Sequence, residues 1–173
     1  MQDKKAGNRF ALLLKDAGKA FLLGLAVAAG VFILLLAVGA VSHGFSALAG
    51  LELARRGLAV PVCPEQLGGL ATPRAPSEQR EGRVVSAAGD DVTAQYRRGA
   101  EETLRLARLY GCVVAVLKER SPSCGSGQVY DGTFSGTLTA GWGTAAALLR
   151  DSGVRVLGES ELEQLLRELG VTR

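Results

Sequence analysis

The sequence predicts an α/β fold: a small Rossmann-like, three-layer domain with a mostly parallel sheet, preceded by an N-terminal transmembrane helix. Short apolar runs alternate with amphipathic helical segments from residue 46 to residue 173, a pattern typical of parallel sheets covered by helices. Cysteines and serines follow two of these runs closely. Residues 20–42 form an apolar stretch long enough to cross a bilayer.

Strands and helices are expected in alternation along residues 46–173. The apolar runs predict strands at 58–62, 82–87, 112–117 and 154–157. The periodic segments predict helices at 46–56, 92–110, 143–151 and 160–170. Asp90 or Asp91 is suited to cap the second helix, and Ser160 with Glu163 forms a capping box for the last. The segments 66–80 and 128–138 are punctuated by glycine or proline and are predicted to be loops.

The N-terminal part divides into a basic segment, residues 1–19, and an apolar span, residues 20–42. Residues 20–41 carry no charge, and at ~1.5 Å per residue a helix of this length crosses the ~30 Å hydrocarbon core. A buried core helix and a cleaved signal peptide are the alternatives. Five basic residues precede the span and only Arg55 and Arg56 follow it closely, so the positive-inside rule places the domain outside the cytoplasm.

Charge and cysteine content exclude several classes of protein. The net charge of +3 lies in residues 1–50, and the remainder of the 173 residues is neutral, which does not support nucleic-acid binding. An odd count of three cysteines indicates no disulfide scaffold and favours a reducing compartment. The single histidine, His43, adjoins the apolar span, so no Ser-His-Asp triad is expected in the domain.

Two thiols follow predicted strands. Cys63 comes directly after the strand at 58–62, and Cys124 lies in a Ser-Pro-Ser-Cys loop after the strand at 112–117. If the strands are parallel, both thiols lie at the edge of the sheet where such folds bind ligands. Thiolates bind iron–sulfur clusters, and buried structural thiols are the alternative. Cys112 begins the second strand, ~20 Å from its far end at ~3.3 Å per residue, and is expected to be a core residue.

Several motifs, in order from about residue 57 to residue 170, resemble a bacterial family once catalogued as a domain of unknown function, DUF523. They are Pro-Val-Cys-Pro-Glu-Gln-Leu-Gly-Gly-Leu-Ala-Thr-Pro-Arg-Ala-Pro at 61–76, Asp-Val-Thr at 91–93, Lys-Glu-Arg-Ser-Pro-Ser-Cys-Gly at 118–125, and Tyr-Asp-Gly-Thr-Phe-Ser-Gly at 130–136. The resemblance implies a non-redox desulfidase that hydrolyses the C=S bond of thiolated uracil-type nucleobases.

The same resemblance implies a cofactor and site residues. The family holds a [4Fe-4S] cluster by three cysteines, and its open iron takes the sulfur of the substrate. Two of these ligands correspond to Cys63 and Cys124, the catalytic carboxylate to Glu65 and the catalytic serine to Ser121. In an extended segment Glu65 would share a face with Cys63. A surface carboxylate that caps the next turn is the alternative for Glu65, and a hydroxyl that bonds the local backbone is the alternative for Ser121.

The N-terminal part departs from the family pattern. The family's first strand and its cysteine-bearing turn are replaced by the hydrophobic span, and residues 1–50 contain no cysteine. A thiol from a partner chain or a small molecule is one way to complete the ligands. A catalytically inactive, membrane-anchored α/β domain for binding or assembly is the alternative function. For an active enzyme, the chemistry favours a single-pass membrane protein with its domain in the cytoplasm, against the charge rule.

Overall fold

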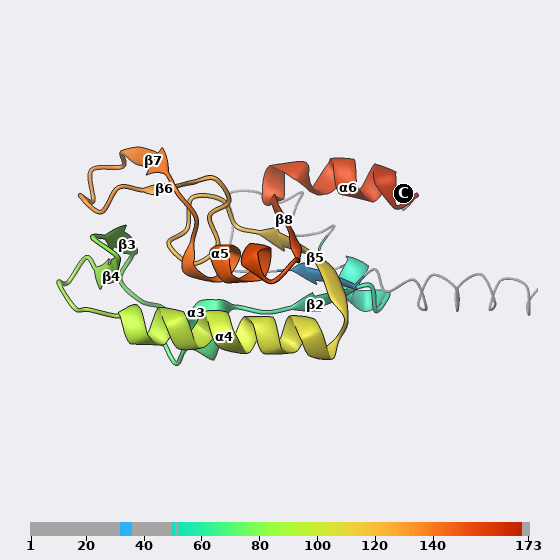
Figure 1. Cartoon of the computed structure of the whole chain (residues 1–173), viewed down its shortest axis with the longest axis horizontal. Coiled ribbons are helices and arrows are strands. Elements are labelled where there is room, and N and C mark those ends of the chain that lie inside the picture. The colour runs from blue at the N-terminus through green and yellow to red at the C-terminus, as the bar shows by residue number, and fades with distance from the viewer. Residues whose placement is uncertain (1–31, 36–49, 51, 171–173) are drawn as a thin grey trace, which may run out of the picture. The chain divides into compact units, whose positions relative to one another are not determined.

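The structure, a computed structural model, describes residues 32–35, 50 and 52–170, and its central sheet has four strands in the order β2-β1-β5-β8. These strands are β1 (Phe32–Leu35), β2 (Ala59–Pro61), β5 (Cys112–Leu117) and β8 (Arg155–Gly158). All of the pairings are parallel: Leu34 of β1 lies opposite Val60 on one side and Ala115 on the other. The predicted α/β class with a parallel sheet is therefore confirmed (Figure 1).

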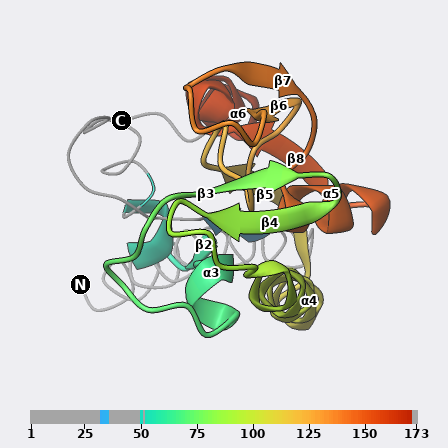
Figure 2. The same cartoon turned by 90° about the vertical axis from the view of Figure 1, so that its left-hand side faces the viewer.

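Helices lie on both sides of this sheet. The long helix α4 (Thr93–Leu109) and the C-terminal helix α6 (Leu162–Glu168) are on opposite sides in both views (Figures 1 and 2). The helices α3 (Pro64–Leu67) and α5 (Thr144–Asp151) pack against α4. Residues 52–55 are also helical. Each of these helices except α3 falls within a segment that the sequence predicts to be helical.

Two short antiparallel hairpins lie partly in predicted loops, and their strand β4 (Arg83–Ser86) falls within the predicted strand at 82–87. Strands β3 (Ser77–Arg80) and β4 form one hairpin, and β6 (Gln128–Tyr130) and β7 (Leu138–Ala140) form the other. The loop predictions for 66–80 and 128–138 are wrong at β3 and β6 and at the start of β7. Strands of three or four residues are too short to show a clear hydrophobic alternation, so their pairing is not visible locally.

The helix caps agree with the prediction at one end of the domain and differ at the other. Asp91 Oδ1 accepts the backbone N–H of Thr93, the first residue of α4, at 2.9 Å, and so satisfies a donor of the first turn as predicted, although the N-cap position itself is Val92. The last helix is preceded by a 3₁₀ turn, η1 (Glu159–Glu161), in which Glu161 accepts the backbone N–H of Gly158 at 2.7 Å. The predicted box on Ser160 is wrong, because the Ser160 hydroxyl bonds the Glu119 carboxylate instead.

The predicted membrane helix, residues 20–42, lies mostly outside the described residues. Within it the structure describes Phe32–Leu35, and these four residues form the strand β1 rather than part of a helix. This strand lies between β2 and β5 in the sheet, although the sequence predicted that the domain lacks its first strand. A central parallel strand is a continuous apolar run, so hydropathy alone does not separate it from a membrane helix. No helix among the described residues is long and apolar enough to span a bilayer.

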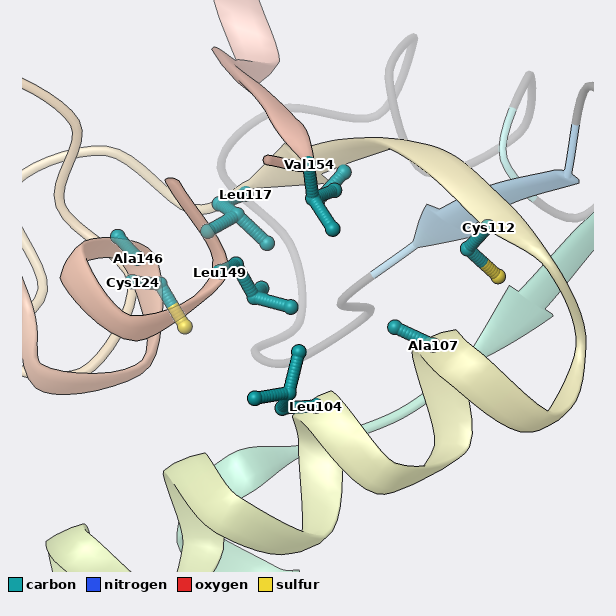
Figure 3. Packing of buried hydrophobic residues seen from close by; sticks show 9 residues of the cluster. Leu104, Ala107, Cys112, Leu117, Cys124, Ala146, Leu149 and Val154 are labelled. Carbon is teal, nitrogen blue, oxygen red and sulfur yellow. The ribbon is translucent and has the colours of Figure 1, made fainter. Parts of the chain in front are cut away.

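The core lies between α4, α5 and the sheet (Figure 3). Leu104 and Ala107 of α4 face Leu117 of β5, with Leu149 of α5 beside them. Cys112 and Cys124 belong to the same cluster but lie at opposite ends of it. Cys112 is 6% exposed, which agrees with its predicted role as a core residue.

Candidate functional site

A pocket of about 590 Å³ lies where β2 and β5 end at their carboxyl termini. Its walls come from the 63–78 segment and the 118–124 loop, and all four predicted site residues line it: Cys63, Glu65, Ser121 and Cys124. In chain order, β2 pairs on one side of β1 and β5 on the other. Open parallel sheets bind ligands at such a reversal of strand order, beyond the carboxyl ends of the strands. The predicted meeting of the two thiol-bearing segments is thus observed.

The first thiol segment turns from strand to helix within three residues. Cys63 is still extended, with φ −125° and ψ 108°, and α3 begins at the next residue, Pro64. Proline is favoured at a helix start because its ring presets φ and no N–H is lost from the helix bonding. Glu65 therefore lies in the first turn of α3, where a carboxylate interacts well with the helix dipole. The prediction that Cys63 and Glu65 share a face of an extended segment is wrong.

Glycines let α3 lie directly against α4. A Cβ atom on Gly99 would lie 2.8 Å from the carbonyl carbon of Pro64, and one on Gly68 would lie 2.9 Å from the carbonyl carbon of Gln95. Arg98 of α4 also donates a hydrogen bond to the carbonyl of Gly68. This close backbone packing fixes the position of α3 against α4, and therefore the positions of Cys63 and Glu65 at the pocket wall.

Arg74 joins Glu65 and Cys63. Its Nε donates to Glu65 Oε2 at 2.6 Å, and its Nη2 lies 3.8 Å from the sulfur of Cys63. The Arg74 and Glu65 side chains are each only 18% exposed. Burial alone would lower the pKa of Arg74, but the hydrogen bond and the charge of Glu65 outweigh it and raise that pKa. Arg74 is therefore a fixed positive charge at the wall of the pocket.

The second thiol is held by backbone hydrogen bonds. Ser121 Oγ accepts the N–H groups of Ser123 and Cys124 at 3.2 and 3.3 Å. At the start of α5, Ala145 N–H donates to the Ser123 carbonyl at 2.8 Å. A Cβ atom on Gly143 would lie 2.5 Å from the Cys124 nitrogen. The alternative for Ser121, a hydroxyl bonded to the local backbone, is thus observed, and Ser121 still lines the pocket.

Burial raises the pKa of both thiols in the core cluster, those of Cys112 and Cys124. The pKa of Cys124 is raised to about 12, first by burial and then by the nearby charges of Glu65 and Cys63. Burial also raises the pKa of Cys112. Without a metal, Cys124 is a neutral thiol near pH 7. Binding a metal there would require it to release its proton, because the thiolate is the form that ligates.

Tyr96 of α4 closes the pocket behind Glu65. Its side chain is 2% exposed and lines the pocket. Burial, and then the negative charge of Glu65, raise its pKa well above the ordinary value. The phenol therefore stays neutral in the folded protein at pH values where an unfolded tyrosine ionises.

This pKa shift predicts an alkaline loss of stability. Because the folded pKa of Tyr96 is raised, its contribution is full below pH ~10 and declines above it, by up to ~1.4 kcal/mol per pH unit. We expect Tyr96→Phe to flatten the fall in unfolding free energy between pH 9 and 11, as measured by urea denaturation. Exposed Tyr110→Phe is the matched control and should leave the wild-type slope unchanged. Equal slopes in all three proteins would show that Tyr96 ionises normally.

The donor set of the pocket fits part of an iron–sulfur site. Two buried thiols, those of Cys63 and Cys124, line one cavity. The remaining cysteine, Cys112, begins β5 at the end of the strand away from the pocket and does not line it. Among the described residues there is no cluster of three or more histidine, cysteine or acidic side chains suited to a metal ion. The described residues thus place two thiols, but not three, at this pocket.

Comparison with known proteins identifies the family. The family model described as 2-thiouracil desulfurase matches residues 43–161. The chain belongs to this family. It is 47% identical over 118 residues to the uncharacterized protein YbbK of Bacillus subtilis (strain 168), covering 62% of this chain and 78% of YbbK.

A solved structure supports the same assignment. The chain is 39% identical to the [4Fe-4S]-dependent thiouracil desulfidase TudS, with a TM-score of 0.70. The match covers 82% of this chain and 99% of TudS. A desulfidase-like function and the α/β fold therefore both have support from relatives.

Arg74 and Glu78 are pocket residues that the sequence did not predict as site residues. Arg74 stands within the 61–76 motif, but only the folded chain shows that it contacts Glu65 and Cys63. Glu78 of β3 is 7% exposed, and its Oε2 accepts the N–H groups of Gly132 at 3.0 Å and Phe134 at 2.9 Å. It thereby ties the 130–136 motif to the pocket wall. A partner more than fifty residues away leaves no local signal.

Proposed function

We propose that this protein is a desulfidase that hydrolyses the C=S bond of a thiolated uracil-type base, with a [4Fe-4S] cluster bound at Cys63 and Cys124. The observation that supports this most is the single pocket lined by both thiols, Glu65 and Ser121. The relation to TudS, whose activity depends on such a cluster, supports the same chemistry. The substrate would be a small planar base, and 590 Å³ is ample for one.

The reaction consumes water and is not a redox step. When bound, the cluster supplies an iron that takes up the sulfur of the thiocarbonyl group. Glu65 is placed to accept a proton from the attacking water, since Arg74 holds its carboxylate at the pocket wall. Oxygen replaces sulfur at the ring carbon, and the sulfur leaves as hydrogen sulfide. Ser121 holds the Cys124 loop through its two backbone contacts and orients the substrate with its hydroxyl hydrogen.

The direct test is turnover by the reconstituted protein. The full chain is purified and loaded with iron and sulfide without oxygen, then incubated with 2-thiouracil. We expect uracil and sulfide in equal amounts, together with iron and sulfide contents in the ratio of a [4Fe-4S] cluster. An iron-free chain that releases no sulfide would contradict the proposal. That result would favour the second candidate, an inactive binding or assembly domain, for which the two-thiol donor set is the motivating observation.

Glu65→Gln tests the proposed base. The amide keeps the size of the side chain but accepts no proton, so we expect kcat to fall on the order of 10²–10⁴-fold. Iron content should stay at the wild-type level. Glu163→Gln on α6 is the matched control, because this carboxylate is exposed and does not line the pocket. Full activity of Glu65→Gln would remove Glu65 from the mechanism.

The site of action in the cell is a further part of the proposal. Iron–sulfur chemistry and a nucleobase substrate favour a cytoplasmic domain. The third ligand would come from a thiol of a partner chain or a small molecule. The sequence predicts association with a membrane through residues 20–42, but Phe32–Leu35 of that span belong to the central sheet. Fractionation of cells that express the full chain, with and without residues 1–31, measures it.

A further inference from the structure

Arg74 contacts both Glu65, the proposed base, and Cys63, a proposed ligand of the cluster. A guanidinium group has five N–H donors. Four have partners here: Nε binds Glu65, Nη1 binds the Ala71 carbonyl at 2.9 Å and Thr72 Oγ1 at 2.8 Å, and Nη2 approaches the Cys63 sulfur. The fifth N–H belongs to Nη2, beside that sulfur.

The contacts of Nη1 make this group rigid. Ala71 and Thr72 are three and two residues before Arg74, so the loop itself fixes the plane of the guanidinium. A planar fork held on one edge presents its other donors in a defined direction. The direction of the Glu65 carboxylate and the position of the Cys63 sulfur are then set by one side chain. Neither Lys118 nor Arg120, the other cations that line the pocket, has a hydrogen bond to Glu65 or Cys63 in the described structure.

Arg74 also offsets the repulsion between two negative charges beside it. A carboxylate at Glu65 and a metal-binding thiolate at Cys63 are two negative charges two residues apart, in a half-buried corner. Like charges in such a place repel strongly. A fixed cation that hydrogen-bonds both of them offsets that repulsion and allows both anions to exist together.

We propose that Arg74 is a positioning residue for desulfidation: it holds Glu65 in the orientation in which its carboxylate accepts the proton of the attacking water, and it holds the sulfur of Cys63 in place as a ligand. The inference rests on the proposed function. Arg74 does not itself exchange a proton or form a bond. Its effect is on the geometry of two neighbours, and a displacement of about 1 Å in such groups can cost 10²-fold in rate.

Three variants test the role of Arg74 in turnover. Arg74→Gln removes the charge and the fork, and Arg74→Lys keeps the charge but loses the fork. Arg105→Gln is the matched control, because Arg105 is exposed on α4, pairs with Glu102 and does not line the pocket. We expect kcat for 2-thiouracil to fall on the order of 10²-fold in both Arg74 variants, with KM changed less than about threefold. Arg105→Gln should keep the wild-type kcat.

Chemical rescue separates positioning from a general loss of structure. Added methylguanidinium should restore part of the kcat of Arg74→Ala and have no effect on Glu65→Gln. A structural defect would not respond to a small cation. No rescue, together with a wild-type kcat in Arg74→Lys, would overturn the proposal.

A readout without turnover tests the contact itself. Thermal unfolding of the full chain is measured for Glu65→Gln, Arg74→Gln and the double variant. We expect the Tm loss of the double variant to be smaller than the sum of the two single losses, because either substitution already breaks the pair. Additive losses would overturn the coupling between Glu65 and Arg74.

Failure of the proposed function and failure of this inference give different results. If the wild type itself releases no sulfide, the proposed function fails. If the wild type is active and its Arg74 variants are equally active, only the role of Arg74 fails.

Discussion

Replacing Cys124 with serine is expected to abolish iron binding and desulfidation together. Cys124 is one of two thiols that line the pocket, and a hydroxyl is a poor substitute for a thiolate as a cluster ligand. Loss of a residue that only hydrogen-bonds a metal ligand typically costs 10–100-fold in metal affinity. We therefore expect a loss on the order of 10²-fold or more in iron retention and in kcat. Iron analysis and sulfide release on anaerobically reconstituted protein measure both.

The chain contains a matched control for this prediction. Cys112 is as buried as Cys124, at 6% against 5% exposure, and belongs to the same hydrophobic cluster. It lies at the other end of that cluster, away from the pocket (Figure 3). Cys112→Ser should therefore lower the Tm while it leaves the iron content per folded chain unchanged. Equal iron loss in both variants would show that the effect is one of packing, and it would remove Cys124 as a ligand.

Gly99→Ala is expected to displace the other thiol segment and to destabilise the domain. In an ordinary helix position this change would stabilise by about 1 kcal/mol. Here the new Cβ atom would lie 2.8 Å from the Pro64 carbonyl carbon and 3.2 Å from the Gly68 nitrogen. These are backbone atoms, which cannot move away by a rotamer change. We expect a net loss of about 3 kcal/mol, or roughly 10 °C in Tm, and a fall in kcat because α3 carries Glu65.

The control for Gly99→Ala is on the same helix. Glu101 is exposed and lies two residues further along α4. Glu101→Ala should change stability by less than about 0.5 kcal/mol and leave activity intact. A Gly99→Ala protein as stable and active as the Glu101→Ala protein would show that α3 can shift without loss. Its position against α4 would then not determine stability or kcat.

Features with a local cause were predictable from residue order. Five or six successive apolar residues are typical of a buried parallel strand, and β2 and β5 both fall in such predicted runs. The strand β8 overlaps the predicted strand at 154–157 and extends one residue beyond it. Asp91 satisfies a donor of the first turn of α4 because its carboxylate reaches an N–H two residues away. Cys63 and Cys124 could be assigned to one edge of the sheet, since parallel strands all end on the same side. Their common pocket follows from that topology.

Features with a distant partner were not predictable in this way. The run Phe32–Leu35 has the composition of a membrane span as well as of a central strand, and only its pairing with β2 and β5 distinguishes the two. The strands β3, β6 and β7 are too short for a clear alternation, and the pairing of β3 with the predicted strand β4 was not visible in the sequence. Glu65 was expected on an extended segment, and the close approach of α3 to α4 through Gly99 defines its actual place.

By itself, the sequence determined the fold class, the two thiols at the sheet edge and the motifs of the family, because these depend on residue type and short spacing. Only the tertiary structure decided which groups touch in the pocket. Arg74 meets Glu65 and Cys63, and Glu78 meets Gly132 and Phe134, across separations of up to 56 residues. Such contacts arise from packing and loop closure, for which neighbouring residues along the chain carry no pattern.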